Sequence, residues 1–142
     1  MKKYFYVFIV LLLIAFILAI KLVSDHKVNE RKKFENNKEL EKYNTTVEIS
    51  GLISVINIAV NKNDENLVEE DENGYYIQNE KNSVEIEVKF LQSDQTFKME
   101  KLYKNDLKKL AELYVGQKFK CMQVKYHKST GYIKYLYFEE LE

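Results

Sequence analysis

The side chains that could act as nucleophiles or proton-transfer groups are few and lie far apart in the sequence. The chain has 142 residues, with one cysteine, Cys121, and two histidines, His26 and His127. Nucleophilic catalysis needs a base beside the nucleophile, but His26 follows an apolar segment and His127 lies in a predicted hairpin. No Gly-x-Ser-x-Gly motif, phosphate-binding glycine loop or His-Glu-x-x-His motif occurs. The sequence therefore predicts no catalytic residues, and an enzyme remains only as a rival hypothesis.

Metal and cofactor sites are not predicted either. A zinc site would have to combine Cys121 and His127 with carboxylates that show no recognisable ligand spacing. Residues 61–74 form an acidic loop that lacks the alternating acidic pattern and the closing Glu of an EF-hand loop. Glu85 and Glu87 share one strand face, where we expect them to be solvent-exposed strand charges. We therefore expect no metal, no cofactor and a solvated acidic loop.

Charge is divided unevenly within the second half of the chain. Residues 61–100 carry eleven acidic residues against four basic ones, whereas residues 101–138 carry nine Lys against two acidic residues. Tyrosines are interleaved with these lysines, and this combination can stack bases and contact phosphates of single-stranded nucleic acid. The candidate binding surface comprises Lys118, Lys120, Lys125, Lys128, Tyr132, Lys134 and Tyr135. Because residues 46–142 are net acidic overall, we favour another protein or a second copy as the partner, with nucleic acid as the alternative.

An apolar segment near the N-terminus determines where these residues are placed. Residues 4–23 are apolar apart from Lys21, and a helix of this length is about long enough to cross a ~30 Å hydrocarbon layer. Residues 1–3 form a short basic N-terminus. Lysines flank the segment at Lys2, Lys3 and Lys21. The sequence therefore predicts a single-pass membrane protein.

The segment resembles a secretory signal but is predicted to remain uncleaved. Its apolar core is longer than the 7–15 residues of a typical cleaved signal, and no Ala-x-Ala-like site follows it. Ile17 and Leu22 occupy the positions where small residues would precede a cut after Ala19 or Ser24. We therefore expect a signal-anchor rather than a removed leader.

The orientation of the domain has two interpretations. Counting basic residues on both sides of the segment favours a cytoplasmic domain, because more lysines follow the segment than precede it. A short basic N-terminus before a lone first helix is instead typical of bacterial signal-anchors that export the following domain. We favour an extracytoplasmic domain, with a cytoplasmic domain as the alternative.

Residues 24–45 are predicted to form a charged juxtamembrane stalk. Their apolar residues, Val28, Phe34 and Leu40, are six positions apart and give no continuous stripe. We therefore expect a solvated helix or an extended spacer that does not contribute to a core.

Residues 46–142 are predicted to form one mainly-β domain. Residues 47–60 are interpreted as a long strand that changes phase at Gly51, which is typical of a bulge or bend. One short helix, Asp106–Tyr114, is predicted between the third and fourth strands, with Gly116 as its stop. The second strand is expected to begin at Tyr75–Gln78 and to include residues 84–90. The remaining strands are expected at 96–103, 119–127 and 132–138.

Four predicted features together resemble the OB-fold. They are the bent first strand around Gly51, the helix Asp106–Tyr114, the Tyr-Val-Gly-Gln-Lys-Phe segment before the fourth strand and the final hairpin. That fold is a five-stranded barrel with a helix between strands three and four. The resemblance covers most of residues 46–142. The chain also resembles small membrane-anchored OB-like proteins of bacteria. An SH3-like barrel or an open α+β sheet would show the same order of elements.

A fold carries no function by itself. Because the sequence predicts no catalytic residues, we expect a membrane-tethered protein-binding or scaffold module, accessory to an envelope complex. The alternative is a single-stranded nucleic-acid-binding module on the cytoplasmic face.

Overall fold

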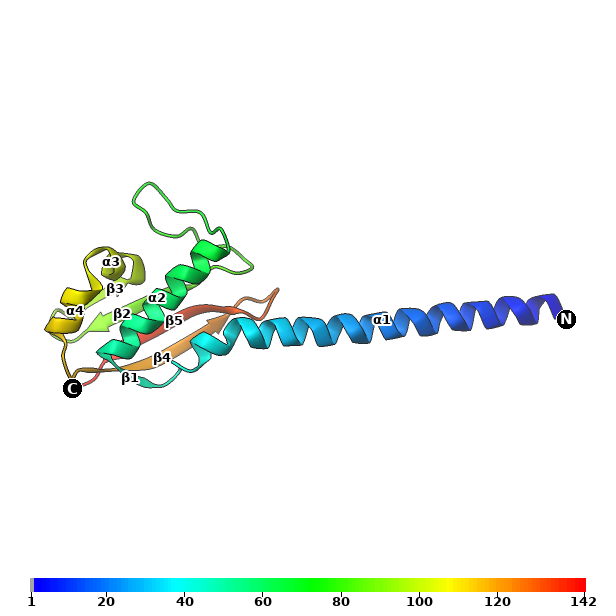
Figure 1. The fold of residues 1–142 in the computed structure, drawn as a ribbon, viewed down its shortest axis with the longest axis horizontal. Helices are drawn as coiled ribbons and strands as arrows, with labels where there is room; N and C mark the ends of the chain where they lie inside the picture. The colour runs from blue at the N-terminus through cyan, green and yellow to red at the C-terminus, as the bar shows by residue number, and fades with distance from the viewer. Residues whose placement is uncertain (1) are drawn as a thin grey trace. The chain divides into compact units, whose positions relative to one another are not determined.

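The computed structural model describes residues 2–142, with side chains from Tyr4 onward (Figure 1). The chain divides into two compact units, Met1–Glu35 and Asn36–Glu142. The helices are α1 (Lys2–Glu41), α2 (Ile49–Glu65), α3 (Met99–Lys104) and α4 (Leu107–Leu113). The strands are β1 (Thr46–Glu48), β2 (Glu85–Phe90), β3 (Gln95–Lys98), β4 (Lys118–Tyr126) and β5 (Ile133–Glu140).

Helix α1 is long and apolar enough near the N-terminus to span a membrane. Its most apolar window has a mean hydropathy of 3.0, and none of that window is buried. Lys21 lies within this helix and is exposed, whereas the side chains of Lys2 and Lys3 fall outside the described residues. The structure therefore establishes an apolar helix long enough to span a membrane. A signal sequence would have the same length and composition.

Residues 49–65 form helix α2, so the predicted long bent strand is wrong. The abundant Ile and Val favoured a strand, but the buried residues follow helical spacing at i, i+3, i+4, i+7 and i+8. These buried residues are Leu52, Val55, Ile56, Ala59 and Val60. Gly51 lies in the first turn of the helix, where a Cβ atom would sit 3.0 Å from Cβ of Val47. The glycine therefore marks a close contact between β1 and α2 and not a bulge.

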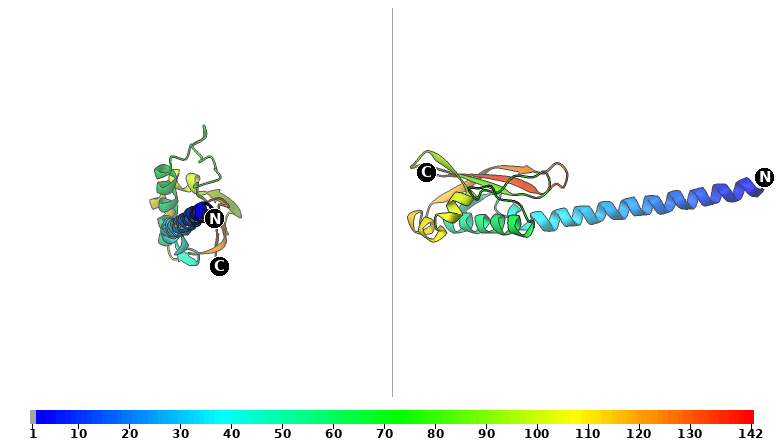
Figure 2. Two further views of the ribbon diagram at one scale, coloured as in Figure 1. Left: turned by 90° about the vertical axis from the view of Figure 1, so that its right-hand side faces the viewer. Right: turned by 90° about the horizontal axis from the view of Figure 1, so that it is seen from above.

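The five strands form one open mixed sheet in the order β1-β4-β5-β2-β3. β2 and β5 are parallel, with Ile86 opposite Leu136 and Val88 opposite Phe138, and the other pairs are antiparallel. β1 and β3 are the two edges, so the sheet does not close into the expected OB-like barrel. Helices α2, α3 and α4 lie on one side of the sheet (Figure 2). This architecture corresponds to the open α+β alternative.

Two further segments differ from the predicted strands. Tyr75–Gln78 is irregular apart from an isolated bridge between Glu70 and Tyr76. The predicted third strand ends at Lys98, because Met99 and Leu102 are buried one helical turn apart in α3. Two short helices, α3 and α4, therefore lie between β3 and β4 where one was expected.

The last turns of α1 belong to the folded domain. Leu40, expected in a solvated stalk, is completely buried in the core, and Asn37 is buried as well. Asn37 hydrogen-bonds the backbone at Gly131 and Ile133. The apolar spacing of residues 24–45 gave no stripe because only the final turns of this segment contact the domain.

Candidate functional site: the apolar pocket beside α3 and α4

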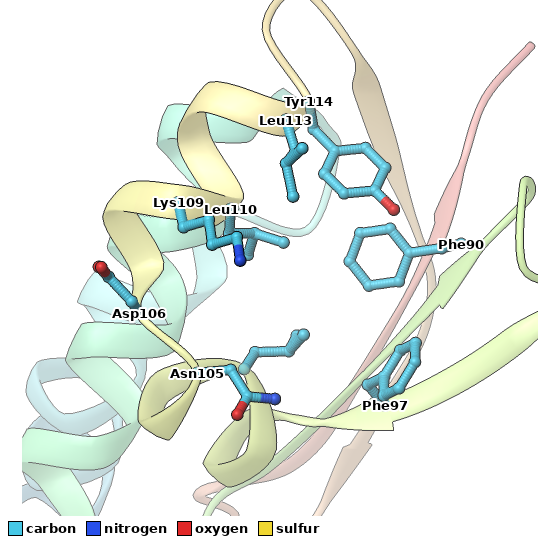
Figure 3. A pocket seen from close by; sticks show the side chains of 9 residues that line it. Phe90, Phe97, Asn105, Asp106, Lys109, Leu110, Leu113 and Tyr114 are labelled. Carbon is cyan, nitrogen blue, oxygen red and sulfur yellow. The ribbon is translucent and has the colours of Figure 1, made fainter.

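A pocket of about 370 Å³ lies between α3, α4 and the β2–β3 edge of the sheet (Figure 3). We call it the α3–α4 pocket. It is lined by Phe90, Phe97, Leu102, Asn105, Asp106, Lys109, Leu110, Leu113 and Tyr114. Most of these side chains are apolar, and the few polar ones are the mixture typical of a ligand or peptide site.

An aromatic cluster forms the wall of the pocket on the sheet side. The ring of Phe90 lies 4.7 Å from that of Tyr114, 5.8 Å from that of Phe97 and 5.6 Å from that of Phe119, measured between centroids. Edge-to-face contacts of this kind add stability beyond area burial. Burial raises the pKa of the Tyr114 hydroxyl, and the Glu140 carboxylate raises it further. Tyr114 therefore contributes a neutral hydroxyl to the wall.

The turn between α3 and α4 determines the position of the opposite wall. Asp106 has a positive φ of 72°, and its carboxylate accepts a hydrogen bond from the main-chain N–H of Lys108 at 2.9 Å. This N-cap starts α4 at Leu107. Leu110 and Leu113 then fall one turn apart, and Figure 3 shows both side chains directed toward the aromatic wall.

The pocket is open, and its apolar rim is exposed to solvent. The side chain of Leu113 is 68% exposed and that of Val115 is 76% exposed. Two exposed lysines lie at the pocket, Lys109 in its lining and Lys101 in α3, whereas Nζ of Lys104 donates to the carbonyl oxygens of Asn73 and Gly74. Lys101 lies over the ring of Phe97, with its Nζ atom 4.6 Å from the centroid. The pocket therefore combines an apolar floor with a positively charged rim.

The predicted lysine and tyrosine surface lies elsewhere, and the structure brings together only part of it. Four of its residues line one hollow of about 600 Å³ with Glu80, Glu85 and Glu87: Lys125, Lys128, Lys134 and Tyr135. Lys118 and Lys120 pair with Glu48 and Thr46 of β1. Tyr132 lies in the hairpin, where its carbonyl oxygen accepts the main-chain N–H of His127.

Acidic groups occupy the same sheet face as these lysines. The Tyr135 hydroxyl donates to Oε2 of Glu87 at 2.7 Å, and Nζ of Lys125 lies 4.6 Å from the Tyr135 ring centroid. Lys98 and Glu85 form an ion pair at 2.8 Å. Burial and the contact with Glu87 raise the pKa of Tyr135. Its ring is thus held between charged neighbours and is not a free platform for a base.

The potentially reactive groups are engaged in structural contacts. Cys121 is buried, its thiol contacts the carbonyl oxygen of Gln123, and burial raises its pKa, which disfavours the nucleophilic thiolate. The His127 Nε2 atom lies 2.7 Å from the carbonyl oxygen of Ser83. Among residues 2–142, no group of three or more His, Cys, Asp or Glu side chains is placed to hold a metal ion.

The α3–α4 pocket was not found from the sequence, because its walls come from four separate elements, β2, β3, α3 and α4. One signal was available: Leu110 and Leu113 lie on the predicted helix one turn apart, where they share a face. The arrangement can bind an apolar side chain and attract acidic groups around it. No family model, curated protein or solved structure matches this chain.

Proposed function

We propose that the protein is a membrane-tethered, non-catalytic protein-binding module. Its α3–α4 pocket takes an apolar side chain from a partner segment whose flanking residues are acidic. The observation that carries this proposal is the pairing of an apolar, solvent-open pocket with two lysines, Lys101 and Lys109, at its edge. Central apolar anchors with charged surroundings are the usual composition of protein interfaces.

The apolar rim supports this proposal. Leu113 and Val115 are adjacent in sequence to the aromatic wall and expose most of their side chains. Their exposure costs hydrophobic free energy that burial under a partner would recover, at about 25 cal/mol per Å². A partner side chain in the pocket would therefore cover residues that the isolated domain leaves in water.

The charge of α3 and α4 defines the chemistry of the partner. Lys101 and Lys109 lie at the pocket, and the exposed Asp106, which caps α4, is the acidic residue in its lining. Acidic residues flanking the apolar anchor would be attracted to this rim, which increases the association rate and the specificity more than the final affinity.

The location of the module is part of the proposal. The apolar helix within α1 would anchor the chain as an uncleaved, single-pass signal-anchor, with the domain outside the cytoplasm and accessory to an envelope complex. A reporter enzyme fused after Glu142, active on only one side of the membrane, tests the orientation. Activity on the cytoplasmic side would contradict the extracytoplasmic placement and leave the pocket proposal intact.

Nucleic acid is the weaker alternative. The lysines that would contact phosphates share their sheet face with Glu85 and Glu87, and Tyr135 is hydrogen-bonded to Glu87. Carboxylates at these positions would repel a phosphate backbone. A binding measurement with single-stranded oligonucleotides at low salt separates the two: we expect no binding, and binding that weakens with added salt would favour the alternative.

The protein-binding proposal is tested by photo-crosslinking in intact membranes. A benzophenone amino acid replaces Leu113 in the full chain, and the matched control carries the same amino acid at Ile77, which is also an exposed apolar position. We expect a crosslinked polypeptide from position 113 that is lost when Leu110→Asp is added. Equal crosslinking from both positions, or none from position 113, would overturn the proposed binding site.

A further inference from the structure

We infer that the segment that fills the α3–α4 pocket is the Leu67 loop of a second copy of this chain. The Leu67 loop comprises residues 65–72, which lie at the C-terminal end of α2 and beyond it. This inference rests on the proposed function and names its partner.

Leu67 occupies a position in the helix terminus that normally holds glycine. Its φ is +53°, its main-chain N–H donates to the carbonyl oxygen of Asp64 at 3.0 Å, and that of Val68 donates to Asn63 at 2.9 Å. These two bonds form the Schellman motif that ends many helices, in which the left-handed residue is usually Gly and sometimes Asn. A leucine in this conformation is destabilising, because its Cβ atom crowds the following carbonyl oxygen.

The side chain of Leu67 has no partner within the domain to offset this cost. It is 87% exposed, the highest value among the large apolar residues of the domain. Val68, by contrast, packs against the core. A strained backbone conformation that presents an apolar side chain to water supports a functional contact at that position.

The composition of the loop is complementary to the pocket. Leu67 is surrounded by exposed carboxylates, which belong to Glu65, Glu69, Glu70, Asp71 and Glu72. The exposed Lys109 lines the pocket and Lys101 lies beside its Phe97 ring, and the pocket volume of about 370 Å³ exceeds the ~150 Å³ apolar cavity that holds benzene. Within residues 4–142, none of the ion pairs involves a carboxylate of this loop or Lys101, Lys108 or Lys109.

None of residues 65–72 lines the α3–α4 pocket of its own domain, although Asp71 lines a neighbouring hollow with Phe97 and Lys101. Figure 1 shows the loop following the C-terminal end of α2, with α4 at the other end of the domain. The contact is therefore heterologous: the loop of one copy binds the pocket of the next. In an open chain, one terminal copy keeps a free loop and the other keeps a free pocket. Such contacts produce rings or open chains rather than closed two-fold dimers.

Disulfide crosslinking of the full chain in its membrane tests this contact. Two tagged populations are co-expressed, one with Leu67→Cys and the other with Leu113→Cys, and oxidised mildly. We expect a disulfide-linked dimer that contains both tags. The native Cys121 is buried, and the wild-type chain measures its background. The matched control replaces Leu67→Cys by Ile77→Cys, for which we expect loss of the dimer.

The double variant L67C/L113C distinguishes the geometry of assembly. With both cysteines in one chain, a heterologous contact gives a ladder of crosslinked trimers and larger species, whereas a closed two-fold contact stops at the dimer. No dimer above the Ile77→Cys control would overturn the inference, and a product limited to dimers would overturn the heterologous arrangement that it states.

Failure of this inference is distinguishable from failure of the proposed function. If photo-crosslinking from position 113 captures a different polypeptide and the cysteine pair gives no dimer, the pocket binds protein but its partner is not a second copy. If position 113 captures nothing, the proposed function itself is overturned. A crosslinked product with twice the mass of the chain supports both.

Discussion

The side-chain oxygen of Asn37 accepts a hydrogen bond from the main-chain N–H of Ile133 at 2.8 Å. The same side chain donates to the carbonyl oxygen of Gly131 at 3.0 Å. One buried amide thus joins the last turns of α1 to the first residues of β5, where the hairpin from β4 returns. Together with the buried Leu40, it makes the end of the apolar helix an integral part of the domain.

Replacing Asn37 by Ala is expected to destabilise the domain by about 2–4 kcal/mol, because two buried backbone groups lose their partner. The matched control is Lys38→Ala, a change at the neighbouring exposed position of the same helix. Urea unfolding of the full chain in detergent, followed by circular dichroism, measures both. Equal midpoints for the two variants would show that the amide contributes little to the stability.

Replacing Leu67 by Gly is expected to stabilise the isolated domain by up to about 1 kcal/mol. Glycine removes the cost of the left-handed conformation, and the greater freedom of its unfolded chain offsets part of the gain. Leu67→Asn should behave similarly, because asparagine also tolerates this conformation. The same unfolding measurement, made at a concentration where the chain is monomeric, tests this. A lower stability of both variants would mean that Leu67 makes a stabilising contact within its own domain.

The pH dependence of stability is expected to change when Glu100 is replaced by Gln. Burial raises the pKa of Glu100, although its Oε1 atom accepts the main-chain N–H of Tyr76. The native state therefore binds more protons than the unfolded state once the pH exceeds the ordinary glutamate pKa of 4.5. Since stability falls with rising pH where the native state binds more protons, wild type should lose stability relative to E100Q as the pH rises above that value.

This loss corresponds to about 1.4 kcal/mol for each unit by which the pKa is raised. Other carboxylates titrate in both proteins, so the difference in free energy of unfolding between wild type and E100Q is the quantity to compare from about pH 4 to about pH 8. A difference that stays constant over this range would contradict a raised pKa for Glu100.

Local signals in the sequence predicted several elements. Asp106 caps α4 and Gly116 has a positive φ just beyond it, as the predicted helix start and stop required. The alternation of Val84, Ile86 and Val88 predicted a half-buried strand, and all three are buried. These features depend on neighbours within a few residues, and sequence patterns report such neighbours directly.

The errors come from tertiary packing that overrides local preference. Residues 49–65 are rich in Ile and Val, which favour strands, yet Leu52, Val55 and Ile56 are buried together on one helical face. Because α2 was interpreted as a strand, the end of the helix was missed, and with it the unusual position of Leu67. Closure into a barrel was expected from the same misinterpreted strand.

The candidate site could not be predicted because it depends on the turn between helices α3 and α4. Asp106 turns α3 into α4 with a positive φ that the sequence signals only as a helix cap. The predicted lysine and tyrosine surface contains glutamates as well as lysines in the structure. The glutamates beside it come from β2, which pairs in parallel with β5 and brings Glu85 next to Tyr135. Parallel pairing of distant strands leaves no signal in one sequence.

Docking of the Leu67 loop in the α3–α4 pocket is tested most directly by mixing two variants of the full chain in liposomes. Leu67→Asn disables the loop and keeps the pocket, whereas Leu113→Asp disables the pocket and keeps the loop. Energy transfer is measured between donor and acceptor fluorescent proteins fused after Glu142. We expect no transfer for either variant alone. We expect restored transfer when Leu67→Asn and Leu113→Asp are mixed, and added salt should weaken it. Equal energy transfer in every combination would contradict docking of the Leu67 loop in the α3–α4 pocket. Transfer in the wild type but none in the mixture would contradict it as well.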